Sequence, residues 1–222
     1  MPLETPTNIG DGKDDTWVTV KKWLDGQQKG HVVYVALGSE ATVSKSELAE
    51  LALGLELSGL PFFWALRKPV GSTKSNSVEL PDRFLERTCH RGVVWTSWVP
   101  QLQILSHESV GGFLTHCGLS SIVEALMFGR PLIMLPIFGD QFLNARVVVD
   151  KHVGIHVPRN EEDGSFTKES VARSVRSVVV DDEGKIYKAK AKELSEIFGD
   201  TKLEKKYIDH FIDYMEKERA AA

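Results

Sequence analysis

The sequence lacks the features that mark several classes of protein. Its 222 residues include only two cysteines, Cys89 and Cys117, which excludes a disulfide scaffold and favours a reducing compartment such as the cytoplasm. Basic and acidic residues nearly balance, 27 against 31, so nucleic acid is a poor candidate partner. The longest nearly apolar stretch, Pro131 to Phe138, is far shorter than the about 20 residues of a membrane span. Met1 to Asp15 is polar and lacks the apolar core of a signal peptide.

The motifs of common cofactors are missing as well. No G-x-G-x-x-G follows an expected strand and no G-x-x-x-x-G-K-[ST] occurs, which argues against dinucleotide and P-loop chemistry. Cys89-His90 and His116-Cys117 lack the spacing of zinc ligands. No Asp-x-Asp pair is available to hold a divalent ion on a diphosphate. We therefore expect a protein that uses neither a metal nor a bound cofactor.

The residues that are present predict an α/β protein. Apolar runs rich in β-branched and aromatic residues alternate with helical patterns along the chain. Most runs are continuous, which is typical of strands buried on both faces. This alternation predicts a doubly wound parallel sheet of about six strands. The expected strands are His31–Leu37, Pro61–Leu66, Val93–Thr96, Val110–Thr115, Pro131–Leu135 and Val153–Val157.

Helical patterns fill the intervals between these runs. Ser44-Lys45-Ser46-Glu47 is a capping box that begins one helix, and Gly59 is placed to end it. No interior stretch resembles a linker, so we expect one domain followed by a C-terminal helix with an apolar stripe. The other expected helices are Thr16–Gln28, Pro81–Thr88, Pro100–Ser106, Leu119–Phe128, Gln141–Lys151, Thr167–Val180, Lys185–Phe198 and Lys202–Arg219.

Polar and small residues follow four of the expected strands. Ligands of an open parallel sheet bind beyond the carboxyl ends of its strands, so these four segments can converge on one cleft. They are Gly38-Ser39-Glu40, Trp98-Val99-Pro100-Gln101, the run from His116 to Ser121, and Gly139-Asp140-Gln141.

The run from His116 to Ser121 is the most informative of the four. A buried strand leads through a glycine turn into a helix, which is the geometry of an anion site at a helix N-terminus. Gly118 leaves room for a phosphate, and His116, Ser120 and Ser121 can donate hydrogen bonds to it. The simpler alternative is that the serines only cap the helix. A hydrolase elbow at Ser120 is discounted, because Ile122 stands where that motif needs glycine.

The other strand ends carry weaker signals. Trp98 can stack on a flat base, although a tryptophan such as Trp98 or Trp95 is more often a core residue. Glu124, on the helix that follows Gly118, can accept hydrogen bonds from ribose hydroxyls, or it can lie on a solvated helix face. Asp140 and Gln141 read by default as a helix cap and a first-turn residue.

One long segment resembles a known family. Trp98 to Gln141 reads WVPQLQILSHESVGGFLTHCGLSSIVEALMFGRPLIMLPIFGDQ, and its framework of W-x-P-Q, H-C-G, E-A, G-x-P and a final D-Q resembles the signature box of plant secondary-product UDP-glycosyltransferases. The flanking stretches VVYVALGSE, FFWALRKP and NEEDGSFTKESV agree as well, so the resemblance extends from Trp17 to the last helix. It is closest to the subgroup that adds a sugar to the sugar of a terpenoid or flavonoid glycoside.

The resemblance implies a fold and a domain arrangement. Members of the family have two Rossmann-like domains of the GT-B type, and this chain corresponds to the C-terminal one, which binds the UDP-sugar. We therefore expect a lead-in over residues 1–15, the UDP-sugar-binding domain over 16–200, and a helix over 201–222 that crosses to the N-terminal domain. The catalytic histidine and the acceptor pocket belong to that missing half, so no catalytic residue is expected here.

The resemblance also implies a role for each donor-site residue. Trp98 would stack on uracil, the Val99 backbone would bind its edge, and Gln101 and Glu124 would hold the ribose. The diphosphate and the sugar would be bound by the remaining residues, which are Ser39, His116, Gly118, Ser120 and Ser121 for the diphosphate, and Asp140 and Gln141 for the sugar.

Two residues depart from the family pattern. The usual HCGWNS reads HCGLSS here, so Leu119 replaces a tryptophan near the sugar and Ser120 replaces an asparagine near the phosphates. UDP-glucose is the expected donor and UDP-rhamnose the alternative.

The reaction implied by the resemblance is an inverting, metal-independent transfer to a small plant metabolite or its glycoside. The alternative is a UDP-sugar-binding or assembly module that does not turn over. Without the N-terminal domain, the apolar stripe of the last helix would lack its cover, and we favour self-association through this helix over its refolding onto this domain or a frayed end. Its stripe consists of Leu203, Tyr207, Ile208, Phe211, Ile212 and Met215.

Overall fold

A computed structural model of the chain describes residues 13–38, 43–67 and 79–221. Within these residues six strands form one sheet, in which every pair of neighbours is parallel. The strands are β1 (Val32–Ala36), β2 (Phe62–Ala65), β3 (Gly92–Trp95), β4 (Val110–Thr115), β5 (Leu132–Met134) and β6 (Gly154–His156).

The strand order is β3-β2-β1-β4-β5-β6, which is the order of a doubly wound Rossmann-type sheet. The predicted fold is therefore confirmed, and each expected strand is found to within one or two residues at its ends. The order reverses between β1 and β4, where the chain leaves the two strands toward opposite sides. That reversal places the expected ligand crevice beyond the carboxyl ends of β1 and β4.

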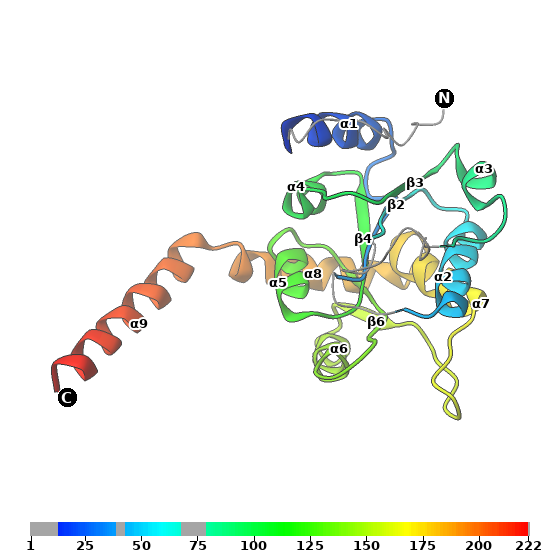
Figure 1. Ribbon diagram of the computed structural model, residues 1–222. Helices are drawn as coiled ribbons and strands as arrows, with labels where there is room; N and C mark the ends of the chain where they lie inside the picture. The colour runs from blue at the N-terminus through cyan, green and yellow to red at the C-terminus, as the bar shows by residue number, and fades with distance from the viewer. Residues whose placement is uncertain (1–12, 39–42, 68–78, 222) are drawn as a thin grey trace.

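Helices cover both faces of the sheet, as Figure 1 shows with the sheet between two helical layers. One layer contains α4, α5 and α6, with α1 beside α4, and the other contains α2, α3 and α7. The helices are α1 (Lys13–Asp25), α2 (Lys45–Ser58), α3 (Phe84–Thr88), α4 (Gln101–Ser106), α5 (Leu119–Met127), α6 (Gln141–Asp150), α7 (Lys168–Val179), α8 (Gly184–Phe198) and α9 (Thr201–Ala221).

Alternate residues of the strands enter two separate cores, because successive side chains of a strand point to opposite faces. In β1, Val32 and Tyr34 pack toward α1, α4 and α5, whereas Val33 and Val35 pack toward α2 and α7. Both faces are buried, which explains why the strands appear in the sequence as unbroken apolar runs.

Helix ends largely follow the local signals. The Ser44–Glu47 capping box forms in full at the start of α2, and Gly59 ends that helix in the left-handed conformation. The expected helix from Pro81 begins only at Phe84, because Arg83 adopts φ of 52° and so interrupts a helical start. α1 begins three residues before the expected Thr16 and ends before the turn at Gly26.

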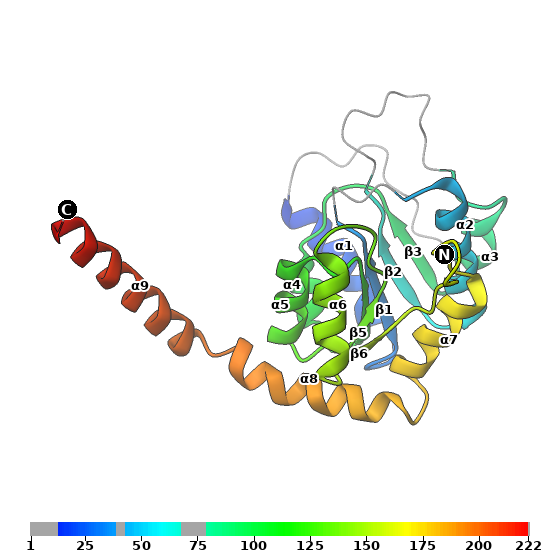
Figure 2. The same cartoon turned by 90° about the horizontal axis from the view of Figure 1, so that it is seen from below.

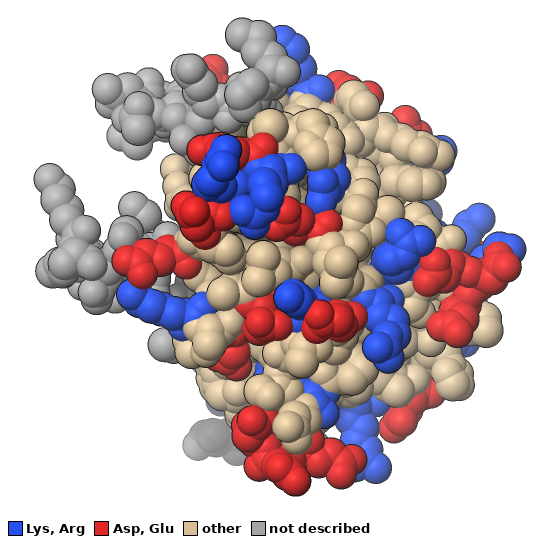
Figure 3. Space-filling view, turned by 90° about the vertical axis from the view of Figure 1, so that its right-hand side faces the viewer, with Lys and Arg blue, Asp and Glu red and all other residues tan. Residues whose placement is uncertain are grey.

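Charges of both signs are interspersed on the face of the molecule that Figure 3 draws. Several are paired across the helices of this side, such as Arg87 with Glu56 and Lys45 with Glu79. This face therefore presents no broad field of one sign to a charged partner. In the described part of the chain, no helix has the length and apolarity required to cross a membrane.

The last helix, α9, projects away from the domain in both Figure 1 and Figure 2. Tyr207, Ile208, Phe211, Ile212 and Met215 are all exposed along it, and Leu203 is half-buried. The amphipathic helix predicted from the sequence is present, and its apolar stripe finds no cover on this domain.

Candidate functional site

A pocket of about 610 Å³ opens beyond the carboxyl ends of β1, β2 and β3, on the side of α4 and α5. It lies beside the strand reversal, where ligands of this fold class bind. Its lining comes from five segments, namely Trp17 of α1, Tyr34 to Gly38, Ala65 and Arg67, the run from Trp98 to Gln103, and Ser121 and Glu124 of α5.

Trp98 forms part of the wall of this pocket. It is 46% exposed, whereas Trp95, three residues earlier, is 6% exposed and stacks against Phe63 at 6.3 Å between ring centroids. Trp95 is therefore a core residue, and the core alternative for Trp98 is wrong. An accessible indole in a pocket offers a flat apolar face to a base.

Val99 follows Trp98 and turns inward. Its side chain is buried in the core on the α4 side, although the residue also lines the pocket. What Val99 can offer a polar ligand is therefore its backbone.

Four polar side chains form a connected network in the same pocket. The Gln101 Nε2 donates to Glu124 Oε2 at 2.7 Å and to Ser121 Oγ at 3.3 Å. The Tyr34 hydroxyl donates to Gln101 Oε1 at 3.0 Å. Glu124 thus lies in the pocket rather than on a solvated helix face, and the network aims a carboxylate and an amide at any ligand there.

The turn after β4 brings His116 between two glycines. A Cβ on Gly38 would lie 2.8 Å from His116 Nε2, and a Cβ on Gly118 would lie 2.7 Å from the same atom. Neither position can therefore carry a side chain without moving the imidazole. The sequence suggested that Gly118 makes room for a phosphate, and the structure adds that both glycines make room for His116.

Ser120 and Ser121 do not cap α5. The N-cap is Gly118, which supplies no side-chain hydrogen bond, and the serines occupy the second and third helical positions. The capping alternative is therefore wrong. The first backbone N–H groups of a helix have no partner within it and carry a partial positive charge, so this end of α5 is suited to an anion.

The start of α6 is tied to the same turn by an asparagine. Asn144 Nδ2 donates to the Cys117 carbonyl and to Asp140 Oδ2, at 3.2 Å each. Gln141 is only 4% exposed, and its Oε1 accepts from the backbone N–H groups of Ile137 and Phe138. Asp140 is exposed at the N-cap position of α6, but its side chain makes no capping bond.

The predicted site residues thus fall into two groups. Trp98, Val99, Gln101, Ser121 and Glu124 meet in the pocket. His116 adjoins it through Gly38, Gly118 packs against His116, and Ser120 precedes the lining residue Ser121 in the chain. Asp140 and Gln141 stand at the next strand end, outside the pocket lining. Ser39 lies outside the described residues.

Several residues of the site were not singled out from the sequence. Tyr34 lies in the apolar run VVYVA, where an aromatic residue reads as core. Trp17 lies within α1 and Arg67 follows β2, and neither was named as a candidate site residue. Asn144 reads as an ordinary helix residue, and only the fold shows that it joins α6 to the turn at Cys117.

The cysteines and the metal prediction can be compared with the structure as well. Both cysteines are free, and burial raises the pKa of the Cys117 thiol to about 12, so this thiol stays protonated and inert. Among the described residues, no group of three or more His, Cys, Asp or Glu side chains is placed to hold a metal ion.

The fold and the pocket together define a Rossmann-type α/β domain with a pocket beside its strand reversal. The family described as "UDP-glucoronosyl and UDP-glucosyl transferase" matches residues 13–217. The chain therefore belongs to the UDP-glycosyltransferase family.

Curated relatives from plants agree with this assignment. UDP-glycosyltransferase 91D2 of Stevia rebaudiana is 71% identical over 221 residues, which are 100% of this chain and 46% of that protein. Soyasaponin III rhamnosyltransferase of Glycine max is 47% identical over 203 residues, covering 91% of this chain and 43% of that protein. The chain thus spans less than half the length of these relatives.

Solved structures agree as well. The structure of Phytolacca americana UGT2 complexed with UDP-2fluoro-glucose and pterostilbene matches with a TM-score of 0.76 and 35% identity, over 87% of this chain and 43% of that one. The structure of Os79 from O. sativa in complex with UDP matches with a TM-score of 0.71 and 32% identity, over 79% and 37%.

Proposed function

We propose that this chain is the UDP-sugar-binding, C-terminal half of an inverting, metal-independent UDP-glycosyltransferase of the GT-B type. Residues 16–200 would form the donor domain, and 201–222 would cross to the N-terminal half. The observation that carries the proposal is the pocket wall that joins an accessible Trp98 to the Gln101–Glu124 pair. A base needs a flat apolar surface and a ribose needs hydrogen-bond acceptors, and this pocket offers both.

Each part of the donor has a matching part of the site. Uracil would stack on Trp98 with its edge on the Val99 backbone, and the ribose would bind Gln101 and Glu124. The diphosphate would lie at the N-terminus of α5, near His116, Gly118, Ser120, Ser121 and Ser39. Asp140 and Gln141 would hold the transferred sugar, which we propose to be glucose, with rhamnose as the alternative.

The chemistry follows from that placement. The bond between the anomeric carbon and the diphosphate breaks as the acceptor hydroxyl attacks from the opposite face, so the configuration inverts. Negative charge grows on the departing UDP, and the α5 N-terminus together with His116 would stabilise it without a metal. The general base that takes the proton from the acceptor hydroxyl would belong to the N-terminal half. The acceptor would be a small plant metabolite or its glycoside.

The whole enzyme is proposed to be cytoplasmic, because both cysteines are free thiols, as is usual in a reducing compartment. A second candidate function is considered because every pocket residue named above is proposed to bind the donor and none is proposed to act as the general base. That candidate is a module that binds UDP-sugars without turnover.

Reconstitution separates the two functions. The chain would be joined to the remaining part of the Stevia relative. Sugar transfer from UDP-glucose and from UDP-rhamnose would then be measured as the amount of product released. We expect transfer by the joined protein and its loss in His116→Ala. A joined protein that folds and binds UDP, yet transfers no sugar, would favour the binding module.

A further inference from the structure

We propose that Tyr34 is a positioning residue of this pocket. Its hydroxyl would act through Gln101 to hold Glu124 ready for the two ribose hydroxyls. The inference rests on the proposed function, because ribose is the part of the ligand that Gln101 and Glu124 are proposed to bind. It concerns a residue in the middle of β1, away from the signature segment between Trp98 and Gln141.

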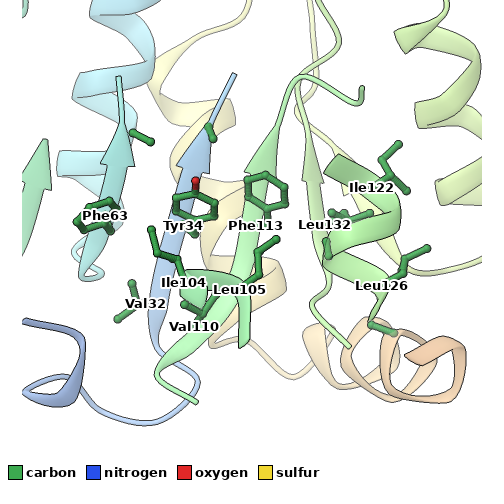
Figure 4. Close-up of a cluster of buried hydrophobic side chains, with 14 of the residues drawn as sticks. Val32, Tyr34, Phe63, Ile104, Leu105, Val110, Phe113, Ile122, Leu126 and Leu132 are labelled. Atoms are coloured by element: carbon green, nitrogen blue, oxygen red, sulfur yellow. The ribbon is translucent and has the colours of Figure 1, made fainter. Parts of the chain in front are cut away.

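The ring of Tyr34 is held rigidly. It is 0% exposed and stacks on Phe113 of the neighbouring strand, with 4.9 Å between ring centroids and 15° between planes. A second ring, Phe63 of β2, lies 6.3 Å from it on the other side. Figure 4 shows Tyr34 beside Phe113 with its oxygen directed toward the carboxyl ends of the strands. The packing thus fixes the hydroxyl at the floor of the pocket.

The directions of the hydrogen bonds follow from the chemistry of the groups. An ionised carboxylate only accepts, so the Gln101 end that faces Glu124 at 2.7 Å must be the Nε2 donor. The Gln101 Oε1 then faces Tyr34 at 3.0 Å, and the phenol must donate. Burial raises the pKa of Tyr34 above its ordinary value, so the phenol keeps the proton that it donates. The order of donation is Tyr34 to Gln101 to Glu124.

This order has a consequence for ligand binding. The Gln101 side chain is held at both ends, by Tyr34 at its oxygen and by Glu124 and Ser121 at its nitrogen. Without the hydroxyl, Oε1 loses its partner and the amide is held at one end only, so it can turn away from Glu124. A carboxylate accepts up to about four hydrogen bonds, so Glu124 keeps capacity for ribose while it is bound to Gln101.

Tyr34→Phe tests the inference because it removes one oxygen and leaves the stacked ring. Affinity would be measured by calorimetry for UDP and for 2′,3′-dideoxy-UDP, which has the same base and diphosphate. The loss of one hydrogen bond predicts about fivefold weaker binding of UDP. Binding of the dideoxy compound should not change, because that ligand has no ribose hydroxyls to place.

A matched control removes a hydroxyl elsewhere. Tyr187 of α8 is half-buried against the core on the opposite face, and Tyr187→Phe should leave both affinities unchanged. Equal weakening of both ligands by Tyr34→Phe would assign Tyr34 a merely structural role and overturn the inference. Unchanged binding of UDP would overturn it as well.

A second variant and the wild-type chain provide two further tests. If Tyr34→Phe does not fold, Gln101→Met tests the same link from the pocket side, and it should remove the preference for UDP over the dideoxy compound. Retention of that preference would overturn the inference, because Tyr34 acts through Gln101. Failure of the wild-type chain to bind UDP would instead contradict the proposed function itself.

Discussion

The proposed site has a nucleotide end and a sugar end, and the residues of this chain enclose the nucleotide end more fully than the sugar end. At the end proposed to bind the base and the ribose, Trp98, Gln101, Glu124 and Tyr34 all line the pocket, and Gln101 is hydrogen-bonded to Tyr34 and Glu124, which come from other segments. At the sugar end, Asp140 is exposed and Leu119 is 61% exposed. The contrast supports the proposal that the nucleotide is recognised within this domain, whereas the placement of the sugar depends on what covers this edge.

The largest effect expected from this contrast is on turnover. The chain should bind UDP and yet transfer no sugar to any acceptor when it is alone. We propose that His116, Glu124 and Asp140 bind the donor, which leaves no other histidine or carboxylate among the described site residues to act as the general base. Product formation would be followed by chromatography with UDP-glucose and UDP-rhamnose. Robust turnover by the purified chain would contradict the proposal that this chain binds the donor and lacks the general base.

Trp98→Ala tests the end proposed to bind the base and the ribose. We expect UDP binding to weaken by roughly 1–3 kcal/mol, the range measured for stacking of a base on an aromatic side chain. Tyr214→Ala on α9 is the matched control, because it removes an exposed aromatic ring far from the pocket and should leave affinity unchanged. Affinity that does not change in Trp98→Ala, with the fold intact by circular dichroism, would remove Trp98 from the site.

Asn144→Ala tests the end proposed to bind the sugar. The substitution removes the two hydrogen bonds by which Asn144 links Asp140 to the turn at Cys117. If Asp140 then loses its proposed hydrogen bond to the sugar, UDP-glucose should bind about 1 kcal/mol less tightly, the net value of one hydrogen bond. UDP alone, which lacks the sugar, should bind as before. Arg146→Ala, an exposed change on the same helix, serves as the control. Equal losses for UDP and UDP-glucose would show that Asn144 supports the whole turn and not its sugar side.

The smallest effect on the site is expected from α9. Removal of residues 201–222 should leave UDP affinity unchanged, because α9 projects away from the domain (Figure 2) and contributes no residue to the pocket lining. The same truncation should convert a self-associated chain into a monomer, since the exposed stripe from Tyr207 to Met215 forms an apolar surface that monomers rarely leave open. Light scattering before and after truncation measures this. A monomer in both states would contradict self-association.

The sequence was most informative where local chemistry decides the structure. Strands buried on both faces leave unbroken apolar runs, and the Ser44–Glu47 box and Gly59 fix both ends of α2. The delayed start of α3 was not predicted, because the left-handed conformation that Arg83 adopts is uncommon for residues other than glycine and no sequence signal marks it. The stripe of α9 reads like that of α7, whose Val171 and Val175 are buried, and periodicity alone cannot tell whether a stripe finds a cover.

The same limit applies to the site. Residues of the signature segment could be named because each stands in a recognisable motif, and the structure places five of them in one pocket. Tyr34 and Asn144 act by joining segments that are far apart in the chain, so no local pattern marks them. Candidate ligand-binding residues were therefore easier to predict from the sequence than the residues that hold those side chains in position.

We propose that this domain alone contains a complete UDP site that needs no metal. Calorimetry of the chain with UDP, in the presence and absence of a chelator, measures this. We expect equal affinity under both conditions, because the α5 N-terminus and His116 would bind the diphosphate. Binding that the chelator abolishes, or no binding of UDP in either condition, would contradict it.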